Sequence, residues 1–265
     1  MKLDSKKHYL QVALNSNIYD AQRIIASLPQ SDRIIIEVGT PLIKEFGAHA
    51  IRSIRSMWQS KLLGFAPSFN MGFNNSMLAS SIFSFAGRAG QPAMQASTNP
   101  LTRNAQPATP YIVADLKCMD RAQREVQIAF QGGASAAIVL GQAPIETVNE
   151  FIASCNELGI DSMVDMMNID QPYKVLRKLK KLPDVVLLHR GVDETELGDK
   201  PLPIHLINKV KGAYDVAISI AGGDTSREVQ SAFFNGANIV VLWKNFYSAT
   251  QDTAQIANEF LQQVK

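Results

Sequence analysis

Cysteine and long apolar runs are scarce in this chain of 265 residues. Its two cysteines, Cys118 and Cys155, cannot make a disulfide framework and lack the spacing of metal ligands, so we expect no zinc site. No apolar run reaches the ~18 residues that a membrane span requires, so we expect no such span. The stretch Met1–His8 has no apolar core and does not resemble a signal peptide, so we expect a cytoplasmic protein.

An excess of either charge is also missing. The 26 basic and 24 acidic residues give a net charge of +2, which offers no electrostatic argument for binding nucleic acid or an anionic membrane. A local basic pocket for one phosphate group is compatible with this balance. Hydrophobic residues make up 46% of the chain, which is enough for a sizeable core.

Short apolar runs alternate with amphipathic stretches along most of the chain. Ile34–Val38, for example, is a continuous and largely β-branched run, typical of a strand buried on both faces. Eight strand–helix units within about 250 residues predict an α/β fold, a closed (β/α)8 TIM barrel that forms one domain over residues 1–265. An open doubly wound sheet is the alternative. The predicted strands are 9–14, 34–38, 111–114, 136–140, 162–164, 185–188, 216–220 and 239–242, and the predicted helices are 21–28, 43–58, 122–131, 145–158, 173–179, 204–210, 227–235 and 253–264.

One segment, residues 59–110, interrupts the alternation between the second predicted helix and the third predicted strand, where connections are usually short. Its second half, Gly90–Pro110, is polar and predicted to be disordered or extended, whereas Met77–Phe85 could form a short apolar helix. We interpret the segment as a surface insertion with a small satellite core, or as an oligomer contact, a partner contact or a flap. Helix-to-strand connections lie on the barrel face opposite the active site, so we do not expect it to cover its own subunit's pocket.

Catalytic groups of a parallel barrel lie at the carboxyl ends of its strands. Polar or glycine residues occupy that position at most of the predicted strands, and they would converge on one pocket. They are Asn15 at the first strand, Glu37 at the second, Asp115, Lys117 and Asp120 at the third, Asp165 at the fifth, His189 and Arg190 at the sixth, Gly222 and Gly223 at the seventh, and Lys244 at the eighth.

Asp115 and Lys117 are two residues apart, so strand periodicity places both on the same side, toward the barrel mouth. A carboxylate beside an ammonium in a partly desolvated site keeps both groups ionised for proton handling. A structural ion pair is the alternative interpretation.

Glu37 lies within an otherwise apolar strand, where an unpaired carboxylate is costly. Together with Asp115 it could hold one Mg²⁺, which prefers oxygen ligands, and an ion pair with Lys117 is the alternative.

His189 ends an apolar strand, a position where a histidine is often structural. Its neighbours Arg190 and Asp193, in a predicted loop, favour an acid–base or substrate-orienting role.

The Gly222-Gly223 pair follows the seventh strand, where loops of such barrels often present backbone N–H groups to a phosphate. The loop after the eighth strand has no glycine, and Lys244 could supply a charge there instead.

These segments together resemble the orotidine-phosphate-decarboxylase superfamily, and most closely the 3-hexulose-6-phosphate synthase family. The Asp-x-Lys-x-x-Asp motif at 115–120 marks the superfamily, and Glu-Val-Gly-Thr-Pro-Leu-Ile-Lys at 37–44 is closer to the synthases. His189-Arg190 looks slightly like the 3-keto-L-gulonate-6-phosphate decarboxylases. The resemblance covers most of the chain apart from the insertion, and it is carried by 10–14, 36–44, 114–120, 164–166, 189–194 and 221–223.

The resemblance implies a Mg²⁺-dependent aldehyde-lyase that adds formaldehyde to ribulose 5-phosphate through an enediolate, and that also catalyses the reverse reaction. It assigns Glu37 and Asp115 to the metal, Lys117 to the negative charge of the enediolate, and His189 to proton transfer. It also implies a homodimer with shared active sites, in which Asp120 reaches the partner's site. The substrate-binding residues would be Asn15, Asp165, Arg190, Gly222, Gly223 and Lys244.

Two positions depart from the family pattern. The family usually has aspartate at the position of Asn15, and Gly-Gly or Gly-Arg at the position of Trp243-Lys244. Asn15 removes a charge from the pocket, and Trp243 could make the pocket smaller. Two further hypotheses therefore stay open: a decarboxylase of the 3-keto-L-gulonate-6-phosphate type or an enzyme with an altered substrate, and a non-catalytic member that binds a partner.

Overall fold

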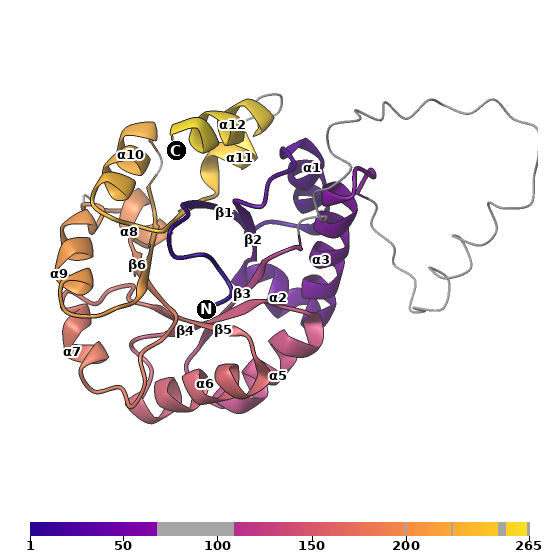
Figure 1. Ribbon diagram of the computed structural model, residues 1–265. Helices are drawn as coiled ribbons and strands as arrows, with labels where there is room; N and C mark the ends of the chain where they lie inside the picture. The colour runs from indigo at the N-terminus through magenta and orange to yellow at the C-terminus, as the bar shows by residue number, and fades with distance from the viewer. Residues whose placement is uncertain (68–108, 199, 224, 249–252, 264–265) are drawn as a thin grey trace, which may run out of the picture.

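The computed structural model describes residues 1–67, 109–198, 200–223, 225–248 and 253–263. Its strands close into one barrel in which each strand is parallel to both neighbours and the order follows the chain (Figure 1). The predicted (β/α)8 barrel is therefore confirmed, and the open doubly wound sheet is wrong. The strands are β1 (Tyr9–Leu14), β2 (Ile34–Val38), β3 (Ile112–Cys118), β4 (Ala136–Leu140), β5 (Asp161–Asp165), β6 (Val185–His189), β7 (Ala217–Ala221) and β8 (Ile239–Leu242).

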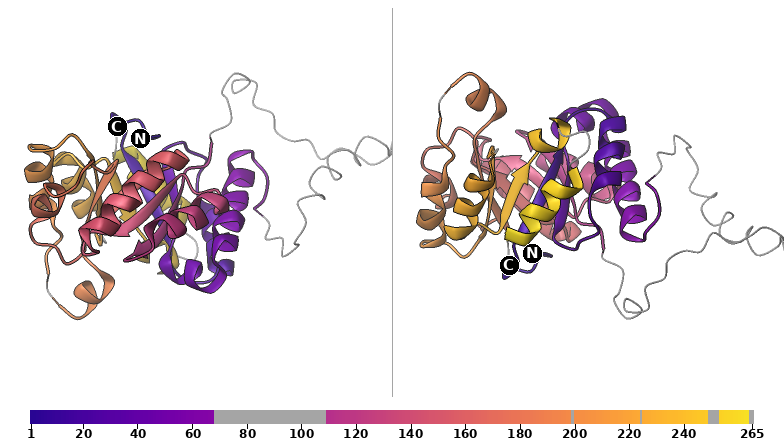
Figure 2. Two further views of the ribbon diagram at one scale, coloured as in Figure 1. Left: turned by 90° about the horizontal axis from the view of Figure 1, so that it is seen from below. Right: turned by 90° about the horizontal axis from the view of Figure 1, so that it is seen from above.

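Helices surround the strands in Figure 1, and both views in Figure 2 place them outside the barrel. None of the helices in the described ranges is long and apolar enough to cross a lipid bilayer. The short helices α8 and α11 follow β6 and β8 and were not predicted. The helices are α1 (Ile18–Ser27), α2 (Thr40–Phe46), α3 (Ala48–Leu62), α5 (Ala122–Gly132), α6 (Ile145–Leu158), α7 (Pro172–Leu176), α8 (Val192–Glu196), the 3-10 turn η3 (Ile204–Leu206), α9 (Ile207–Lys211), α10 (Ser226–Phe234), α11 (Lys244–Ser248) and α12 (Thr253–Gln263).

The second predicted helix is in fact two helices, because α2 ends and α3 begins at Gly47. This residue has a φ of 58°, in the left-handed region that glycine adopts without steric cost. Amphipathic periodicity alone did not reveal the break. The helix α3 also continues to Leu62, inside the segment predicted as an insertion. The predictions for Met77–Phe85 and for almost all of Gly90–Pro110 lie outside the described residues.

Apolar side chains pack in two layers, which explains why the strands read as continuous apolar runs. The outer layer lies between strands and helices and includes the fully buried Trp58, Phe151 and Phe246. The inner layer fills the barrel with alternate strand residues, among them Ile35 and Leu187. Both faces of each strand are therefore buried, and a polar side chain on an inner face requires a specific partner.

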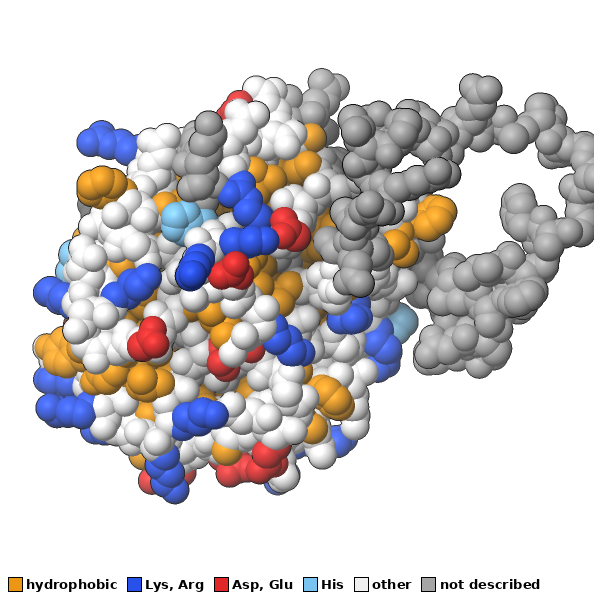
Figure 3. Space-filling view, in the orientation of Figure 1, with side chains coloured by type: hydrophobic (Ala, Val, Ile, Leu, Met, Phe, Trp, Pro, Cys, Tyr) orange, Lys and Arg blue, Asp and Glu red, His pale blue; other side chains and the backbone are white. Residues whose placement is uncertain are grey.

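Different segments of the chain lie at the two ends of the barrel. The N-terminal segment covers one end and α8 lies at the other (Figure 2). At the first end, Asp161 accepts hydrogen bonds from the backbone N–H of Lys2 and the hydroxyl of Tyr111, both at 2.7 Å. Basic and acidic side chains are interspersed on the face in Figure 3, as the balanced charge of the chain suggests.

Candidate active site

A cavity of about 430 Å³ opens at the carboxyl ends of the strands. Asp165 and Gly223 do not line it although both are buried nearby, and the exposed Asp120 does not line it either. The other residues predicted for the site line this cavity: Asn15, Glu37, Asp115, Lys117, His189, Arg190, Gly222 and Lys244.

The third strand brings Asp115 and Lys117 together through an irregular backbone. From Ala114 to Cys118, β3 advances four residues while its partner β4 advances two, so the register shifts. Lys117 has a φ of 44°, which is uncommon for a residue with a side chain. Its Nζ lies 3.1 Å from Oδ2 of Asp115. The predicted proximity is present, but a bulge produces it rather than simple strand alternation, as is common beside active sites.

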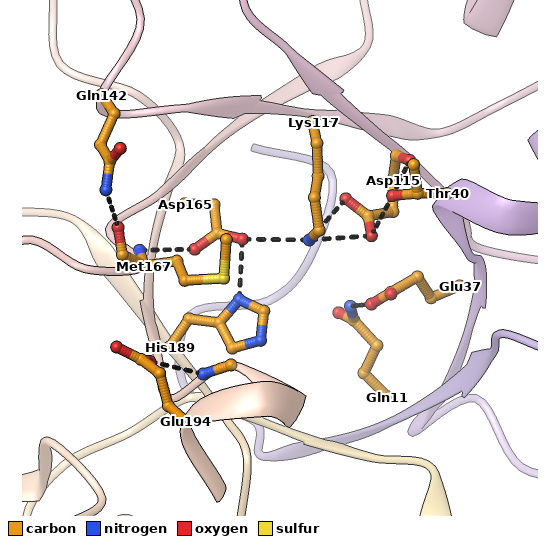
Figure 4. A network of polar contacts seen from close by, with 11 residues as sticks. Gln11, Glu37, Thr40, Asp115, Lys117, Gln142, Asp165, Met167, His189 and Glu194 are labelled. Carbon is orange, nitrogen blue, oxygen red and sulfur yellow. Dashed lines mark hydrogen bonds and ion pairs between the residues drawn. The ribbon is translucent and has the colours of Figure 1, made fainter. Parts of the chain in front are cut away.

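Lys117 lies between two carboxylates (Figure 4). Besides its contact with Asp115, its Nζ is 3.4 Å from Oδ2 of Asp165. The hydroxyl of Thr40 donates to Oδ2 of Asp115 at 2.9 Å and so holds that carboxylate in place. Burial lowers the pKa of Lys117, but Asp115, Asp165 and Glu37 outweigh burial and hold the pKa well above its usual value. The side chain therefore presents a fixed ammonium to the cavity.

The imidazole of His189 shares the Asp165 carboxylate with Lys117. Its Nδ1 is 2.8 Å from Oδ2 of Asp165, and the backbone N–H of Met167 donates to Oδ1 at 2.9 Å. Because a carboxylate only accepts, Nδ1 carries the proton and Nε2 is the nitrogen that titrates. Burial lowers the pKa of His189, but Asp165 raises it more, so the net pKa lies above its usual value. Asp165, which is fully buried, thus positions both Lys117 and His189, while its predicted contact with substrate stays a prediction.

Glu37 is the least compensated charge of the site. Burial and the neighbouring Asp115 raise its pKa to about 7. Its carboxylate accepts a hydrogen bond from Nε2 of Gln11, a neutral group. Within the described ranges, Glu37 forms no ion pair with Lys117, so the alternative of a direct pair between them is wrong.

Glu37 and Asp115 together fit a divalent cation. Both are buried carboxylates on adjacent strands, and Asp115 disfavours the ionised form of Glu37, an effect that a cation between them would reverse. No group of three or more His, Cys, Asp and Glu side chains suited to a metal occurs in the described part of the chain. Mg²⁺ tolerates such a site because it keeps several waters or substrate oxygens as ligands.

The loops after β6 and β7 are joined by Arg190. Its guanidinium donates to the carbonyl of Gly222, with Nε at 3.1 Å, and its Nη2 lies 3.5 Å from Oε1 of Glu228. Gly222 has a φ of 93°, and a Cβ there would lie 2.2 Å from the carbonyl oxygen of Arg190. A glycine is therefore required at this position, and the Gly-Gly pair has a packing role besides any contact with phosphate.

The start of α11, directly after β8, contacts α8 through Lys244. Nζ of Lys244 is 3.1 Å from Oε1 of Glu196 and 5.8 Å from the centre of the Trp243 ring. Trp243 lines the cavity and packs against the inner layer, and its effect on the size of the cavity stays a prediction. The ring contacts Tyr247 edge-on, with 5.9 Å between centroids, and the Tyr247 hydroxyl accepts the backbone N–H of Asn15 at 2.9 Å.

Two further residues, to which the sequence assigned no role, contact the site. Gln11 contacts Glu37, and Thr40 contacts Asp115 and lines the cavity. Gln11 gave a usable signal, because a long polar side chain within the apolar strand Tyr9–Leu14 requires a partner. Thr40 lies in the 37–44 motif, but its contact with Asp115 was not predicted because the two residues are distant in sequence.

Comparison with known proteins identifies related sequences and folds. The orotidine 5'-phosphate decarboxylase / HUMPS family matches residues 89–256. A bifunctional enzyme Fae/Hps from Methanoregula boonei is 30% identical over 257 residues, which are 97% of this chain and 52% of that protein. The bifunctional enzyme Fae/Hps from Methanoculleus marisnigri is 31% identical over the same shares. The chain thus spans about half the length of the curated relatives it matches.

Solved structures support the fold. The 3-hexulose-6-phosphate synthase from Salmonella typhimurium superposes with a TM-score of 0.70 at 24% identity, covering 96% of this chain and 97% of that one. The 3-keto-L-gulonate-6-phosphate decarboxylase from Vibrio cholerae gives a TM-score of 0.64 at 18% identity, covering 97% of both chains. At these identities the likeness concerns the barrel and does not distinguish between substrates.

Proposed function

Because the chain belongs to the orotidine 5'-phosphate decarboxylase / HUMPS family, we propose that it is a 3-hexulose-6-phosphate-synthase-like aldehyde-lyase. The proposed reaction is the addition of formaldehyde to ribulose 5-phosphate, and its reverse. The names of the relatives and of the Salmonella structure support this choice. The observation that carries it is Lys117, an ammonium held between two carboxylates in a cavity that His189 and Glu37 also line.

His189 is the proposed proton carrier. Its Nε2 takes the proton from the carbon next to the carbonyl of the sugar phosphate, and the electron pair moves to the carbonyl oxygen to give an enediolate. That carbon then attacks formaldehyde, and the proton on His189 passes to the new alkoxide. Asp165 keeps the imidazole in the required tautomer and stabilises the imidazolium that forms.

Lys117 is proposed to stabilise the negative charge of the enediolate. Two carboxylates already hold its ammonium in place, so little reorganisation accompanies the reaction, which is the condition under which such stabilisation is effective. Mg²⁺ held by Glu37 and Asp115 would supply further positive charge to the substrate oxygens. Arg190, Lys244 and the N–H groups of Gly222 and Gly223 are proposed to bind the phosphate end of the substrate.

A homodimer with shared sites is part of the proposal. Asp120 is exposed and does not line the cavity of its own subunit, which suits a residue that serves a neighbour's site. A mixing experiment tests this. If Asp120 completes the partner's site, inactive Asp120→Ala and inactive Lys117→Ala proteins regain activity when their subunits exchange, to about a quarter of wild type, because one site in each mixed dimer is intact. Absence of recovery between folded, exchanging dimers would contradict shared sites.

A cytoplasmic location is also proposed. Both Cys118 and Cys155 are buried free thiols in the structure, which suits a reducing compartment. Burial raises the pKa of the Cys118 thiol to about 11, so it is a weak nucleophile.

The activity is tested by mixing the protein with Mg²⁺, ribulose 5-phosphate and formaldehyde and following the loss of formaldehyde. The proposal predicts a loss that requires all components and that Lys117→Ala abolishes. A parallel reaction with 3-keto-L-gulonate 6-phosphate measures decarboxylation. Release of CO₂ there, with no loss of formaldehyde in the first reaction, would replace the proposed activity with that of the decarboxylases.

A further inference from the structure

Gln11 occupies an unusual place in the barrel. It is fully buried on β1, among apolar residues of the inner layer such as Tyr9 and Ile35. Its Cα pairs with that of Ile35, whereas Glu37 pairs with Ala13, so Gln11 lies one inward-facing position deeper than Glu37. The side chain reaches up from there, and its Nε2 donates to Oε2 of Glu37 (Figure 4).

The other end of the Gln11 amide has no partner. When Glu37 is ionised, its carboxylate only accepts hydrogen bonds, so the NH₂ group of Gln11 faces Glu37 and the carbonyl oxygen faces away. That oxygen, Oε1, is buried and has no hydrogen-bond partner in the described structure. A buried orphan acceptor destabilises a fold, and an apolar side chain of the same length would avoid it. An unpaired buried acceptor of this kind is expected where the placement of a functional side chain matters more than the stability of the fold.

We propose that Gln11 is a positioning residue for the cation site, holding one oxygen of the Glu37 carboxylate so that the other faces Asp115 and the cavity. Thr40 does the equivalent for Asp115, to which its hydroxyl donates at 2.9 Å. Each carboxylate would then have one neutral donor that fixes its direction, and Asp115 has the ammonium of Lys117 besides, 3.1 Å from its Oδ2. This inference rests on the proposed function insofar as that function includes Mg²⁺, and it adds a residue to which neither the motif nor the resemblance assigns a role.

The matched pair of variants is Gln11→Met and Ser219→Ala. Methionine keeps the length of glutamine but cannot donate to Glu37. Ser219 is also fully buried inside the barrel with an unpartnered hydroxyl, yet it has no contact with Glu37, so Ser219→Ala measures the effect of changing a buried polar group alone. Gln11→Asn, which withdraws the amide by one methylene, is a second variant for the case in which Gln11→Met does not fold.

Each full-length protein is titrated with MnCl₂, and free Mn²⁺ is followed by its electron paramagnetic resonance signal. We expect the Mn²⁺ dissociation constant to rise about tenfold or more in Gln11→Met and Gln11→Asn, as is typical when a residue that hydrogen-bonds to a metal ligand is lost. In Ser219→Ala it should stay within about twofold of the wild-type value. Near-UV circular dichroism checks that the barrels are intact. In the formaldehyde assay, the Mg²⁺ concentration for half-maximal rate rises likewise, while kcat at saturating Mg²⁺ changes less than about threefold.

The failures are distinguishable. Wild-type binding of Mn²⁺ with equal binding by the folded Gln11 variants would overturn the positioning role and leave the proposed function standing. A fall in kcat at saturating Mg²⁺ with an unchanged Mg²⁺ dependence would also overturn it, because that pattern indicates general damage. A wild-type protein that binds no Mn²⁺ would overturn both this inference and the metal in the proposed function.

Discussion

The two sides of the cavity hold their charges in different ways. On the side built by β3, β5 and β6, Lys117 and His189 share the carboxylate of Asp165, and Lys117 also contacts Asp115. On the side built by β1 and β2, Glu37 has only the neutral amide of Gln11. The pKa directions reflect this difference. Burial raises the pKa of Asp165, but His189 and Lys117 lower it more, so its net pKa is lowered. Burial raises the pKa of Glu37 to about 7.

The difference separates charges that the chain pairs by itself from a charge that requires an added cation. The first side is complete, with each charge paired and oriented before substrate arrives, as electrostatic catalysis requires. The second side carries a buried carboxylate that forms no direct ion pair within the described residues, and a cation would stabilise it. We therefore expect changes on the first side to affect the reaction itself, and changes on the second to affect stability and metal dependence.

The largest effect is expected from Lys117→Ala, which removes the cation common to both carboxylates of the complete side. The rate should fall about 1000-fold, the upper range for loss of one charge-stabilising donor. Formaldehyde consumption measures it, and thermal unfolding checks the fold. Lys178→Ala, at an exposed lysine beyond α7, is the control and should retain full activity. An active, folded Lys117→Ala protein would show that the site is misassigned.

Asp165→Asn should reduce kcat about 100-fold, because it removes the group that orients the proton carrier. It should also move the pH profile. As a base, His189 acts when neutral, so the raised pKa places the acidic limb of wild type above 6.5, and loss of Asp165 should shift that limb to lower pH. Asp161→Asn, on the same strand at the opposite end of the barrel, should leave the profile unchanged. An unshifted limb in Asp165→Asn would mean that another group is the base.

Glu37 should make metal-free stability depend on pH. Its folded pKa of about 7 exceeds its ordinary value of 4.5, so the folded state retains a proton that the unfolded state releases. Stability is therefore full below pH 4.5 and falls as the pH rises through about 7, by about 3 kcal/mol in total. Glu37→Gln should remove this loss, and Mg²⁺ should offset it in wild type. Denaturant unfolding at pH 5 and pH 8 measures it, and equal pH dependence of both proteins would contradict the account.

The smallest effect is expected at the cavity mouth. Lys244→Ala should raise KM for ribulose 5-phosphate about tenfold and change kcat little, because it removes a charge that binds the phosphate rather than one that acts on the reacting carbon. Lys209→Ala, an exposed lysine on α9, is the control. A change in kcat with constant KM would place Lys244 in the reaction itself.

Sequence patterning predicted the barrel because strands buried on both faces read as apolar runs, and β1, β2, β4, β8 and α6 have the predicted bounds. It also predicted most cavity residues, since strand ends converge in a closed parallel barrel. It missed Gly47, where a backbone angle and not periodicity breaks the helix. It missed the contact of Thr40 with Asp115 and the bulge that contains Lys117, because both depend on pairing between strands far apart in sequence.

The side of the cavity built by β3, β5 and β6 is proposed to generate and stabilise an enediolate. The most direct measurement of this is deuterium uptake from D₂O at the carbon next to the carbonyl of ribulose 5-phosphate, followed by NMR with Mg²⁺ present and formaldehyde absent. We predict exchange with wild type and none above background with Lys117→Ala. No exchange by a folded wild type that binds Mn²⁺ and ribulose 5-phosphate, or undiminished exchange by Lys117→Ala, would contradict the claim.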